Sequence, residues 1–311
     1  MTKPLISVLL AVYNGGAYLK LSVDSVLDQD LNDFELLVLD DCSTDSSYEW
    51  LYGLKDTRIK LFRNKTNRGL FYNLNFLIEH SNSSLIKLWS QDDIMYPHCL
   101  SNFVNFHNLY PDIGFSYSAR DMIDENGRIK EHFSTDNTPE IISSELHAKI
   151  AYYTGSIAGN ISNVCISKQA LNKVGDFDER MKISADFDMW VRLAEHFETG
   201  FIRLPLIQLR NHLGQLSRNP KFYINHVKED LLVYRKLNSY SSELMRNYGK
   251  KVLRNNKFVF YFTLMVKEFI KGRINTGYAF AKLLSSMDNL GLLTISFIKN
   301  KLIKQKNPFQ D

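Results

Sequence analysis

The chain has 311 residues, 44% of them hydrophobic and 23% charged, so it can bury a sizeable core and is expected to be globular. Its cysteines, Cys42, Cys99 and Cys165, lie far apart without CxxC spacing, which argues against a zinc site or a disulfide framework and favours a reducing, cytoplasmic setting. No apolar run approaches the roughly 20 residues of a transmembrane helix, so we do not expect an integral membrane protein.

The first hundred residues alternate strand-like and helix-like segments, which is typical of parallel strands covered by helices. The predicted strands are residues 5–12, 34–40, 59–63, 85–90 and 113–117. Helices are predicted around residues 19–27, from a capping cluster at 43–45, and over 70–79. Beyond residue 117 the alternation fades, and beyond 217 the pattern is mainly helical. We therefore expect an α/β fold with a mixed, mainly parallel sheet and a C-terminal helical extension.

In an open α/β sheet, ligands bind beyond the carboxyl ends of the strands, and these positions are unusually polar here. They carry Tyr13-Asn14-Gly15-Gly16 after the first strand, Asp40-Asp41-Cys42-Ser43-Thr44-Asp45 at the second and Ser90-Gln91-Asp92-Asp93 at the fourth. We expect these three segments to converge on one acidic cleft.

Each pair of carboxylates in this cleft could have a binding role or a purely structural one. Asp92 and Asp93 could bind a hard divalent cation, Mg²⁺ or Mn²⁺, that also holds a diphosphate, or they could form a solvated turn before a helix. Their position after a buried-looking strand favours the metal interpretation. Asp40 and Asp41 could accept hydrogen bonds from a base N–H or a ribose hydroxyl, whereas the alternative for Asp41 is helix capping.

Two later segments also carry polar side chains that suit chemistry. Asp186 directly precedes an amphipathic helical pattern, so it could enter the cleft as a general base or cap that helix. Arg210, His212 and Ser217 follow the strand-like run 201–209 and could fold over a diphosphate. A neutral His212 could ligate the metal, although an isolated histidine usually does not.

The net charge of +4 hides an asymmetry along the chain. Residues 250–311 hold 12 Lys and Arg against 3 Asp and Glu, which leaves 26 against 31 in the first 249 residues. This basic tail could lie on an anionic membrane surface, or its helices could pack on the body of the protein with a solvated basic face. In this tail, apolar residues recur at roughly helical spacing beside the basic residues Lys267, Lys271 and Arg273. The apolar residues are Phe258, Tyr261, Phe262, Met265, Phe269 and Ile270.

Together these segments resemble family 2 glycosyltransferases, which are inverting enzymes of GT-A fold. Residues 4–14 look like the opening strand of that family, and VLDDCSTD at 38–45 is similar to its V-x-D-D-G-S-T-D. Asn67-Arg68-Gly69, with Asn75, resembles the N-x-G segment of the family, and residues 90–93 take the place of its D-x-D-D. Residues 174–179 resemble its V-G-G-F-D-E, and residues 185–190 resemble its E-D-x-D-L-W. The resemblance covers residues 4–218 and leaves the basic tail unexplained.

The resemblance implies roles by position. The nucleotide sugar would be held by Ala11, Tyr13, Asn14, Asp40, Asp41, Arg68 and Asp92. Asp92 and Asp93 would divide the ribose and metal contacts, His212 would complete the metal site or touch the phosphates, and Asp186 would be the catalytic base. The sequence departs from the family pattern where Ser90 replaces the first Asp of the metal motif, Cys42 replaces Gly, and Ala185 replaces the Glu before the base.

The resemblance further implies the reaction. A hexosyl or N-acetylhexosaminyl group would move, with inversion, from a nucleoside-diphosphate sugar, with a UDP-sugar favoured, to a hydroxyl of a glycan or lipid-linked glycan in bacterial capsule, O-antigen or lipopolysaccharide synthesis. Mn²⁺ or Mg²⁺ would be the cofactor, and the location would be cytoplasmic, at the inner face of the membrane. Residues 1–110 would form the nucleotide-sugar half and 111–218 the acceptor half of one GT-A domain, followed by a basic helical extension at 219–311.

Other classes fit the sequence less well. The first strand is not followed by G-x-G-x-x-G, which argues against a nicotinamide-dependent dehydrogenase, or by a glycine-rich basic loop, which argues against a nucleotidyltransferase. No nucleic-acid-binding motif accompanies the basic tail. The main alternative is a catalytically inactive homologue that binds a sugar nucleotide or glycan.

Overall fold

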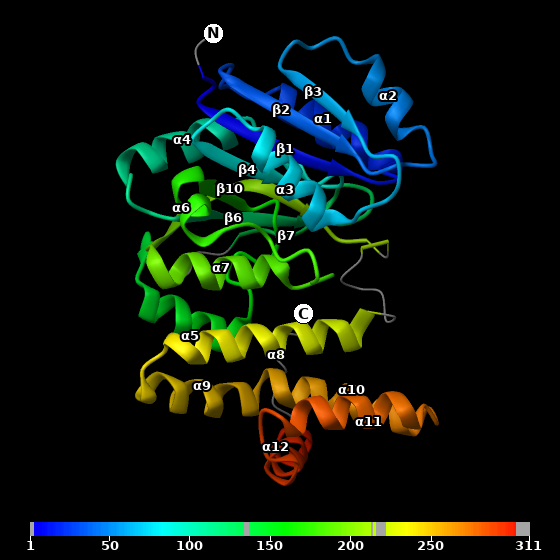
Figure 1. Ribbon diagram of the computed structural model, residues 1–311, viewed down its shortest axis with the longest axis vertical. Coiled ribbons are helices and arrows are strands. Elements are labelled where there is room, and N and C mark those ends of the chain that lie inside the picture. Colours follow the sequence, from blue (N-terminus) through cyan, green and yellow to red (C-terminus); the bar gives the residue numbers. More distant parts are fainter. Residues whose placement is uncertain (1–2, 134–136, 213, 216–221, 303–311) are drawn as a thin grey trace.

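The computed structural model describes residues 3–133, 137–212, 214–215 and 222–302. Its central sheet has the strand order β3-β2-β1-β4-β9-β6-β10-β5, with β7 paired to β6 and β8 paired to β10 (Figure 1). The strands are β1 (Ile6–Val12), β2 (Phe34–Asp40), β3 (Ile59–Arg63), β4 (Leu85–Trp89), β5 (Ile94–Met95), β6 (Phe115–Ile123), β7 (Ile129–Glu131), β8 (Ile141–Ile142), β9 (Val164–Ser167) and β10 (Thr199–Arg210).

Helices cover both faces of this sheet and continue as a C-terminal extension. They are α1 (Gly16–Leu27), α2 (Ser47–Gly53), α3 (Leu70–His80), α4 (Cys99–Leu109), α5 (Ser144–Thr154), α6 (Lys168–Val174), α7 (Ala185–His196), α8 (Tyr223–Tyr240), α9 (Glu243–Asn255), α10 (Lys257–Ile270), α11 (Ile274–Ser285) and α12 (Leu290–Leu302). The predicted α/β class, with a mixed sheet flanked by helices and further C-terminal helices, is confirmed.

The N-terminal half of the sheet is parallel and buried on both faces. β1 runs parallel to β2 on one side and to β4 on the other, and β3 runs parallel to β2. Val8 and Leu10 belong to a core cluster with residues of α1 and α4, whereas Leu9 belongs to one with residues of α3. Burial on both faces explains why this strand is a continuous apolar run in the sequence. The carboxyl ends of β1, β2 and β4 therefore lie along one edge of the sheet.

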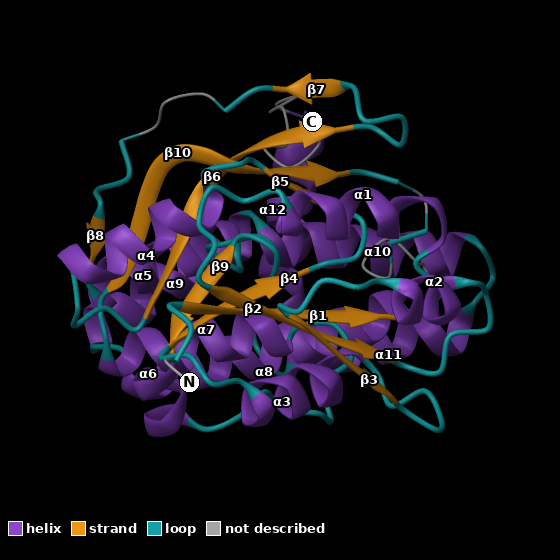
Figure 2. Ribbon diagram, turned by 90° about the horizontal axis from the view of Figure 1, so that it is seen from above, coloured by secondary structure: helices purple, strands orange, loops and turns teal. Residues whose placement is uncertain are grey.

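The second half of the sheet is joined to the first through β9, which runs antiparallel to both β4 and β6. β10 runs parallel to β6, with register shifts around Pro205, a residue that cannot donate a ladder hydrogen bond. Its last part pairs antiparallel with β5. Figure 2 shows β5, β7 and β10 gathered on the side of the sheet opposite β3. The pairing of β10 with β5 brings the end of β10 beside the turn at Asp92 and Asp93.

The C-terminal helices extend the molecule away from β1, β2 and β3, with α8 packed on α7 and the later helices beyond it (Figure 1). On α10, Phe258, Tyr261, Phe262 and Met265 are buried and join the core cluster that contains residues of α7 and α8. This apolar face therefore packs inside the protein, whereas Ile270 at the end of the helix is exposed. In the part of the chain that the structure describes, no helix is both long and apolar enough to cross a membrane.

The predicted bounds of β2 and β3 agree with the structure, but α2 begins at Ser47, not at the capping cluster. The side chains of this cluster bind two places, because Oδ1 of Asp45 accepts a hydrogen bond from the N–H of Ser47 at the start of α2 (3.0 Å), while other atoms of the cluster bind the turn after β1. The hydroxyl of Ser43 accepts a hydrogen bond from the N–H of Asn14 (3.0 Å), and the carboxylate of Asp45 accepts one from the N–H of Gly16 (3.1 Å). The cluster thus fastens the turn between β1 and α1 to the end of β2.

Candidate active site

A cavity of about 620 Å³ opens at the carboxyl ends of β1, β2, β4 and β10, which is a usual size and place for a small-molecule site. Of the predicted site residues, those that line it are Ala11, Tyr13, Asp41, Asp92, Asp93, Asp186 and His212. The rest of the lining is Val12, Asn67, Gly69, Leu70, Phe71, Asn73, Trp89, Ser90, Gln91, Gly159, Asn160, Ile161, Lys182, Ile183, Leu209, Gly214 and Gln215. The fold thus brings together the predicted strand-end segments and the start of α7.

Asp41 organises the loop between β3 and α3. Its Oδ1 accepts hydrogen bonds from Nδ2 of Asn64 (2.7 Å) and from the N–H of Arg68 (2.8 Å), and its Oδ2 accepts one from the N–H of Gly69 (2.9 Å). Gly69 has φ 88°, in the left-handed region that favours glycine, and this lets two successive N–H groups point at one carboxylate. A carboxylate has about four acceptor positions, so one of them remains for a donor group of a ligand.

Three predicted nucleotide-sugar residues lie outside the lining of the cavity. Asp40 is fully buried, and its Oδ2 accepts a hydrogen bond from the N–H of Ser43 (3.2 Å) and lies 3.3 Å from Nε of Arg63. Oδ1 of Asn14 accepts a hydrogen bond from the backbone of the loop after β2 (2.8 Å). The guanidinium of Arg68 lies over an aromatic ring of α3, 4.0 Å from its centre. In this structure all three side chains support the loops around the cavity.

The neighbours Asp92 and Asp93 have different environments. Asp93 is buried, its Oδ2 accepts a hydrogen bond from Oγ of Ser162 (2.5 Å), and its Oδ1 accepts one from the N–H of Arg210 (2.9 Å). Burial, and after it the adjacent charge of Asp92, raises the pKa of Asp93 to about 7. Asp93 therefore joins the turn after β4 to the loop before β9 and to the end of β10.

The carboxylate of Asp92 is more accessible and faces a histidine. Its Oδ2 lies 2.9 Å from Nε2 of His212, and the two side chains keep 21% and 18% of their surface exposed. Nδ1 of His212 accepts a hydrogen bond from the N–H of Gly214 (3.2 Å), so the ring is oriented from both sides. A carboxylate is a ligand that suits Mn²⁺ or Mg²⁺, so Asp92 fits the expected cation, and His212 could join it as a ligand only in place of its hydrogen bond to Asp92.

Within residues 3–302 as described, no three His, Cys, Asp or Glu side chains gather into a complete metal cluster. A cation at Asp92 would therefore need ligands that are not protein side chains. Mg²⁺ in phosphate-transfer sites commonly has this arrangement, with one or two carboxylates and the phosphates of the substrate. The site thus suits a metal ion that arrives with, or is completed by, a diphosphate.

Arg210 does not fold over the cavity as the sequence suggested. Its guanidinium is buried, with Nε donating to the carbonyl of Asp92 (2.8 Å) and Nη1 to the carbonyl of Asp124 (3.0 Å). It also lies over the ring of Tyr18, 4.5 Å from its centre. Because it still belongs to β10, it is held inside the sheet edge and supports the turn that carries Asp92. Ser217 lies outside the described residues.

Asp186 occupies the first turn of α7, behind the N-cap residue Ser184, and lines the cavity. Its Oδ1 accepts a hydrogen bond from the N–H of Phe187 (2.7 Å), which favours the ionised form. Burial outweighs this effect and, with smaller contributions from the charges of Asp230 and Glu229, raises the pKa of Asp186 to about 7. A carboxylate with a pKa near neutrality that faces a cavity is well suited to take a proton from a ligand.

Sequence reasoning missed two residues that shape this site. The side-chain amide of Gln91 accepts a hydrogen bond from the N–H of Tyr13 (2.9 Å) and donates one to its carbonyl (3.1 Å), so it ties the end of β1 to the turn after β4. Ser162 holds Asp93 from 69 residues away. The position of Gln91 directly after a predicted strand, in a polar segment, could have indicated a role at the site. Nothing in the sequence marks Ser162 as a partner of Asp93.

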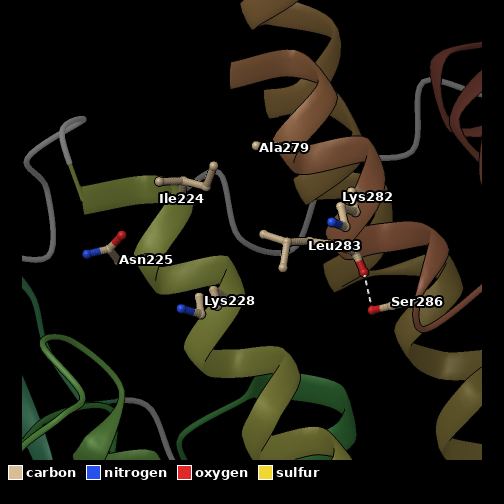
Figure 3. Close-up of a pocket in the computed structure, with 7 residues that line it drawn as sticks. All are labelled: Ile224, Asn225, Lys228, Ala279, Lys282, Leu283 and Ser286. Atoms are coloured by element: carbon tan, nitrogen blue, oxygen red, sulfur yellow. Dashed lines mark hydrogen bonds between the residues drawn. The ribbon is translucent and has the colours of Figure 1, made fainter. Parts of the chain in front are cut away.

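A second cavity, of about 460 Å³, lies between α8 and α11 (Figure 3). It is lined by Ile224, Asn225, Lys228, Ala279, Lys282, Leu283 and Ser286. The surface of this cavity is mainly apolar although four of these residues are polar or charged, and it contains neither a carboxylate nor an imidazole. Of these two cavities, the first is therefore the one whose side chains suit acid-base or metal chemistry.

Comparison with known proteins bears on the family and the fold of the chain. The sequence profile described as Glycosyl transferase family 2 matches residues 7–166. An uncharacterized glycosyltransferase of Methanocaldococcus jannaschii is 29% identical over 278 residues, which cover 87% of this chain and 90% of the relative. Another, from Rickettsia bellii, is 28% identical over 218 residues, which cover 69% of this chain but only 31% of that longer relative.

Solved structures share the fold. S. aureus TarS 1–349 in complex with UDP-GlcNAc superposes with a TM-score of 0.62 at 17% identity, covering 81% of this chain and 70% of that one. The mannosyltransferase PcManGT from Pyrobaculum calidifontis, in complex with GDP-Man and Mn²⁺, has a TM-score of 0.58 at 13% identity, covering 98% of this chain and 89% of that one. Because the family profile matches just over half of the sequence, the chain belongs to glycosyl transferase family 2.

Proposed function

We propose that the protein is an inverting glycosyltransferase that moves a sugar from a nucleoside-diphosphate sugar to an acceptor hydroxyl. The observation that carries this proposal is a single cavity lined by Asp41, Asp92 and Asp186 at the ends of β2, β4 and the start of α7. Asp41 keeps an acceptor position for a donor group of the nucleotide, Asp92 suits a cation on the diphosphate, and Asp186 suits the acceptor. Family membership supports the reaction class.

In the proposed reaction, Asp186 accepts the proton of the acceptor hydroxyl as that oxygen attacks the anomeric carbon. The new bond joins the acceptor oxygen to this carbon, and the bond from the carbon to the phosphate oxygen breaks, so the nucleoside diphosphate leaves with the electron pair. A single displacement inverts the configuration. The pKa of Asp186, raised to about 7 by burial, leaves it a stronger base than an ordinary aspartate while still largely ionised just above neutrality.

Asp92, with His212 beside it, would hold Mn²⁺ or Mg²⁺. When bound, such an ion supplies positive charge that stabilises the departing diphosphate, so no protein acid is required on the leaving group. Asp93 supports this site indirectly, because its hydrogen bonds to Ser162 and Arg210 fix the turn that carries Asp92.

The finer specificity is proposed as follows. The donor is a UDP-sugar, in line with the UDP-GlcNAc bound by TarS, while the GDP-Man bound by PcManGT marks the nearest competing donor class. Residues 1–110 hold the nucleotide sugar, and residues 111–218 hold the acceptor. The acceptor is a glycan or lipid-linked glycan of the bacterial surface, and the enzyme works in the cytoplasm at the inner face of the membrane.

We propose that the protein contacts the membrane surface through the junction of α10 and α11, which lies within the basic tail. Ile270 is 80% exposed and Tyr278 66% exposed there, and Lys271 and Arg273 lie between them in the sequence. Exposed apolar side chains beside basic ones are typical of segments that bind anionic lipid surfaces. Flotation with liposomes rich in phosphatidylglycerol should recover less of an Ile270→Ser/Tyr278→Ser variant than of the unmodified protein. Equal recovery contradicts this contact.

The test of the proposed function is release of nucleoside diphosphate from UDP-GlcNAc, UDP-glucose, UDP-galactose and GDP-mannose, with and without Mn²⁺. Slow hydrolysis in the absence of an acceptor, stimulated by Mn²⁺, is the expected result. Binding of a nucleotide sugar without any release of nucleoside diphosphate supports the alternative, a homologue that binds the sugar nucleotide but does not turn it over. The feature that motivates this alternative is Ser90, which stands where the family's metal motif has a carboxylate.

A further inference from the structure

We propose that Glu229 and Asp230 on α8 are positioning residues for Asp186, so that the C-terminal extension is part of the catalytic apparatus. The inference rests on the proposed function, because it assigns to these two carboxylates the placement of the base in that reaction. Neither residue lines the cavity, and each acts through the loop that precedes α7.

Glu229 binds the backbone of this loop at three successive residues. Its Oε1 accepts a hydrogen bond from the N–H of Lys182 (2.9 Å), and its Oε2 accepts hydrogen bonds from the N–H groups of Ile183 and Ser184 (2.9 Å each). Glu229 is only 6% exposed, so these bonds form away from bulk water. Charge-assisted bonds of this kind are about twice as strong as neutral ones. The loop is therefore fixed two residues before Asp186.

Asp230 holds the same point through a side chain. Its Oδ1 accepts a hydrogen bond from Oγ of Ser184 (2.7 Å), the N-cap residue of α7, and its Oδ2 accepts one from the hydroxyl of Tyr261 on α10. Nζ of Lys257 lies 3.8 Å from Oδ2, and Nε2 of His226 lies 3.6 Å from Oδ1. A chain of contacts thus runs from α10 through α8 to the start of α7.

This arrangement also sets the charge around the base. The first turn of α7 already contains the carboxylates of Asp186 and Asp188, and Glu229 adds a third negative charge that binds the N–H of the N-cap residue Ser184. From α8, Asp186 faces the negative charges of Glu229 and Asp230, and Lys257 on α10 partly balances the charge of Asp230, beside which the ring of His226 also lies. From the cavity side, the charged or titratable groups are Tyr13, Lys182, Asp41, Asp92, Asp93 and His212. The two α8 carboxylates contribute to the raised pKa of Asp186, after burial.

The geometry explains a feature that the sequence left open. The family resemblance ends near residue 218, yet α8 packs directly on α7 and the later helices cover α8 (Figure 1). Tyr234 and Leu237 on α8 are fully buried, so the extension could not be removed without exposing the core. The extension therefore serves the active site as well as any contact with an acceptor or membrane.

The test is the pH dependence of kcat/KM for hydrolysis of whichever nucleotide sugar the unmodified protein cleaves fastest, in the presence of Mn²⁺. Asp230→Asn removes a negative neighbour, so ionised Asp186 becomes easier to form and the acid limb should move to lower pH by at least about half a unit. Lys257→Met leaves Asp230 uncompensated and should move the limb to higher pH. Glu229→Gln loses an acceptor for the loop and should lower kcat at least about tenfold, with UDP affinity changed less than about threefold.

Asp288→Asn is the matched control. Asp288 is another buried carboxylate of the extension, paired with Arg254 (2.7 Å), but it makes no contact with the loop before α7 among the described hydrogen bonds. It should lower the melting temperature without moving the acid limb. Asp230→Asn and Lys257→Met profiles that coincide with the unmodified protein overturn the inference, and if Asp230→Asn does not fold, Lys257→Met decides alone. Absence of hydrolysis by the unmodified protein overturns the proposed function, and the inference with it.

Discussion

The carboxylate of Asp92 lies 2.9 Å from the imidazole of His212, although 120 residues separate them in the sequence. The contact exists because the end of β10 pairs with β5, directly after the turn that carries Asp92. A carboxylate and an imidazole brought together at a strand end, beside a cavity of about 620 Å³, form the part of the site best suited to a cation.

Replacement of either partner should weaken metal dependence. We expect Asp92→Asn to lower nucleoside diphosphate release about 100-fold or more, and His212→Ala to lower it about 10- to 100-fold with a higher Mn²⁺ concentration for half activation. A Mn²⁺ titration of the release rate measures both effects. His196→Ala, at an exposed histidine near the end of α7, is the control. Unchanged Mn²⁺ dependence in both variants would remove the cation from this site.

Asp93 should matter for stability more than as a direct ligand. Asp93→Ala leaves Oγ of Ser162 and the N–H of Arg210 without their acceptor in the core, and should lower the free energy of unfolding by about 2–4 kcal/mol. Asp93→Asn can still accept from Arg210 and donate to Ser162, so it should cost much less. Urea unfolding of both variants measures the difference. Equal losses of unfolding free energy in the two variants would contradict the view that the hydrogen bonds to Ser162 and Arg210 are what Asp93 contributes.

The activity should rise with pH through neutrality. Asp186 acts as a base only when ionised, and burial raises its pKa to about 7, so below that value kcat/KM should fall about tenfold per pH unit and above it should level off. An ordinary aspartate, with a pKa near 3.8, would leave the rate flat from pH 5 to 8. A pH profile of donor hydrolysis at saturating Mn²⁺ distinguishes the two, and a flat profile across this range would contradict the role of a buried base.

Cys42 stands in a backbone conformation that favours glycine. Its φ is 63°, and a side chain in the left-handed region costs about 1–2 kcal/mol, whereas glycine there costs about 0.5–1 kcal/mol of chain entropy. Cys42→Gly should therefore leave the free energy of unfolding unchanged or raise it by up to about 1 kcal/mol. Cys42→Val, with a branched side chain, should lower it by about 1–2 kcal/mol. Thermal melts compare the two, and a valine variant more stable than the glycine variant would speak against strain at this turn.

The parallel half of the fold could be predicted from the sequence because its strands are buried on both faces and its helices repeat at regular spacing. β2 and β3 were placed with their correct bounds. The second half was harder to predict, since β5 and β8 have two residues each and β10 is interrupted around Pro205. Strands this short depend on neighbours distant in the sequence and carry little periodicity of their own.

Within the site, the residue types could be predicted but not their orientation. Asp92 and Asp93 are adjacent, and only the fold decides that Asp93 turns inward to Ser162 while Asp92 faces His212. The same limit applies to Arg210, whose buried guanidinium supports a turn, and to the apolar face of α10, which packs inside. Periodicity shows that a face is apolar, but not which surface covers it.

The central claim is that Asp186 takes the proton in a transfer carried out within this one cavity. Its most direct test is nucleoside diphosphate release by Asp186→Asn, measured with donor affinity by calorimetry and with Asp176→Asn, at an exposed position before α7, as the control. We predict that Asp186→Asn lowers turnover at least about 1,000-fold while UDP affinity in Mn²⁺ stays within about threefold and the control stays active. Near-normal turnover by Asp186→Asn would contradict the account.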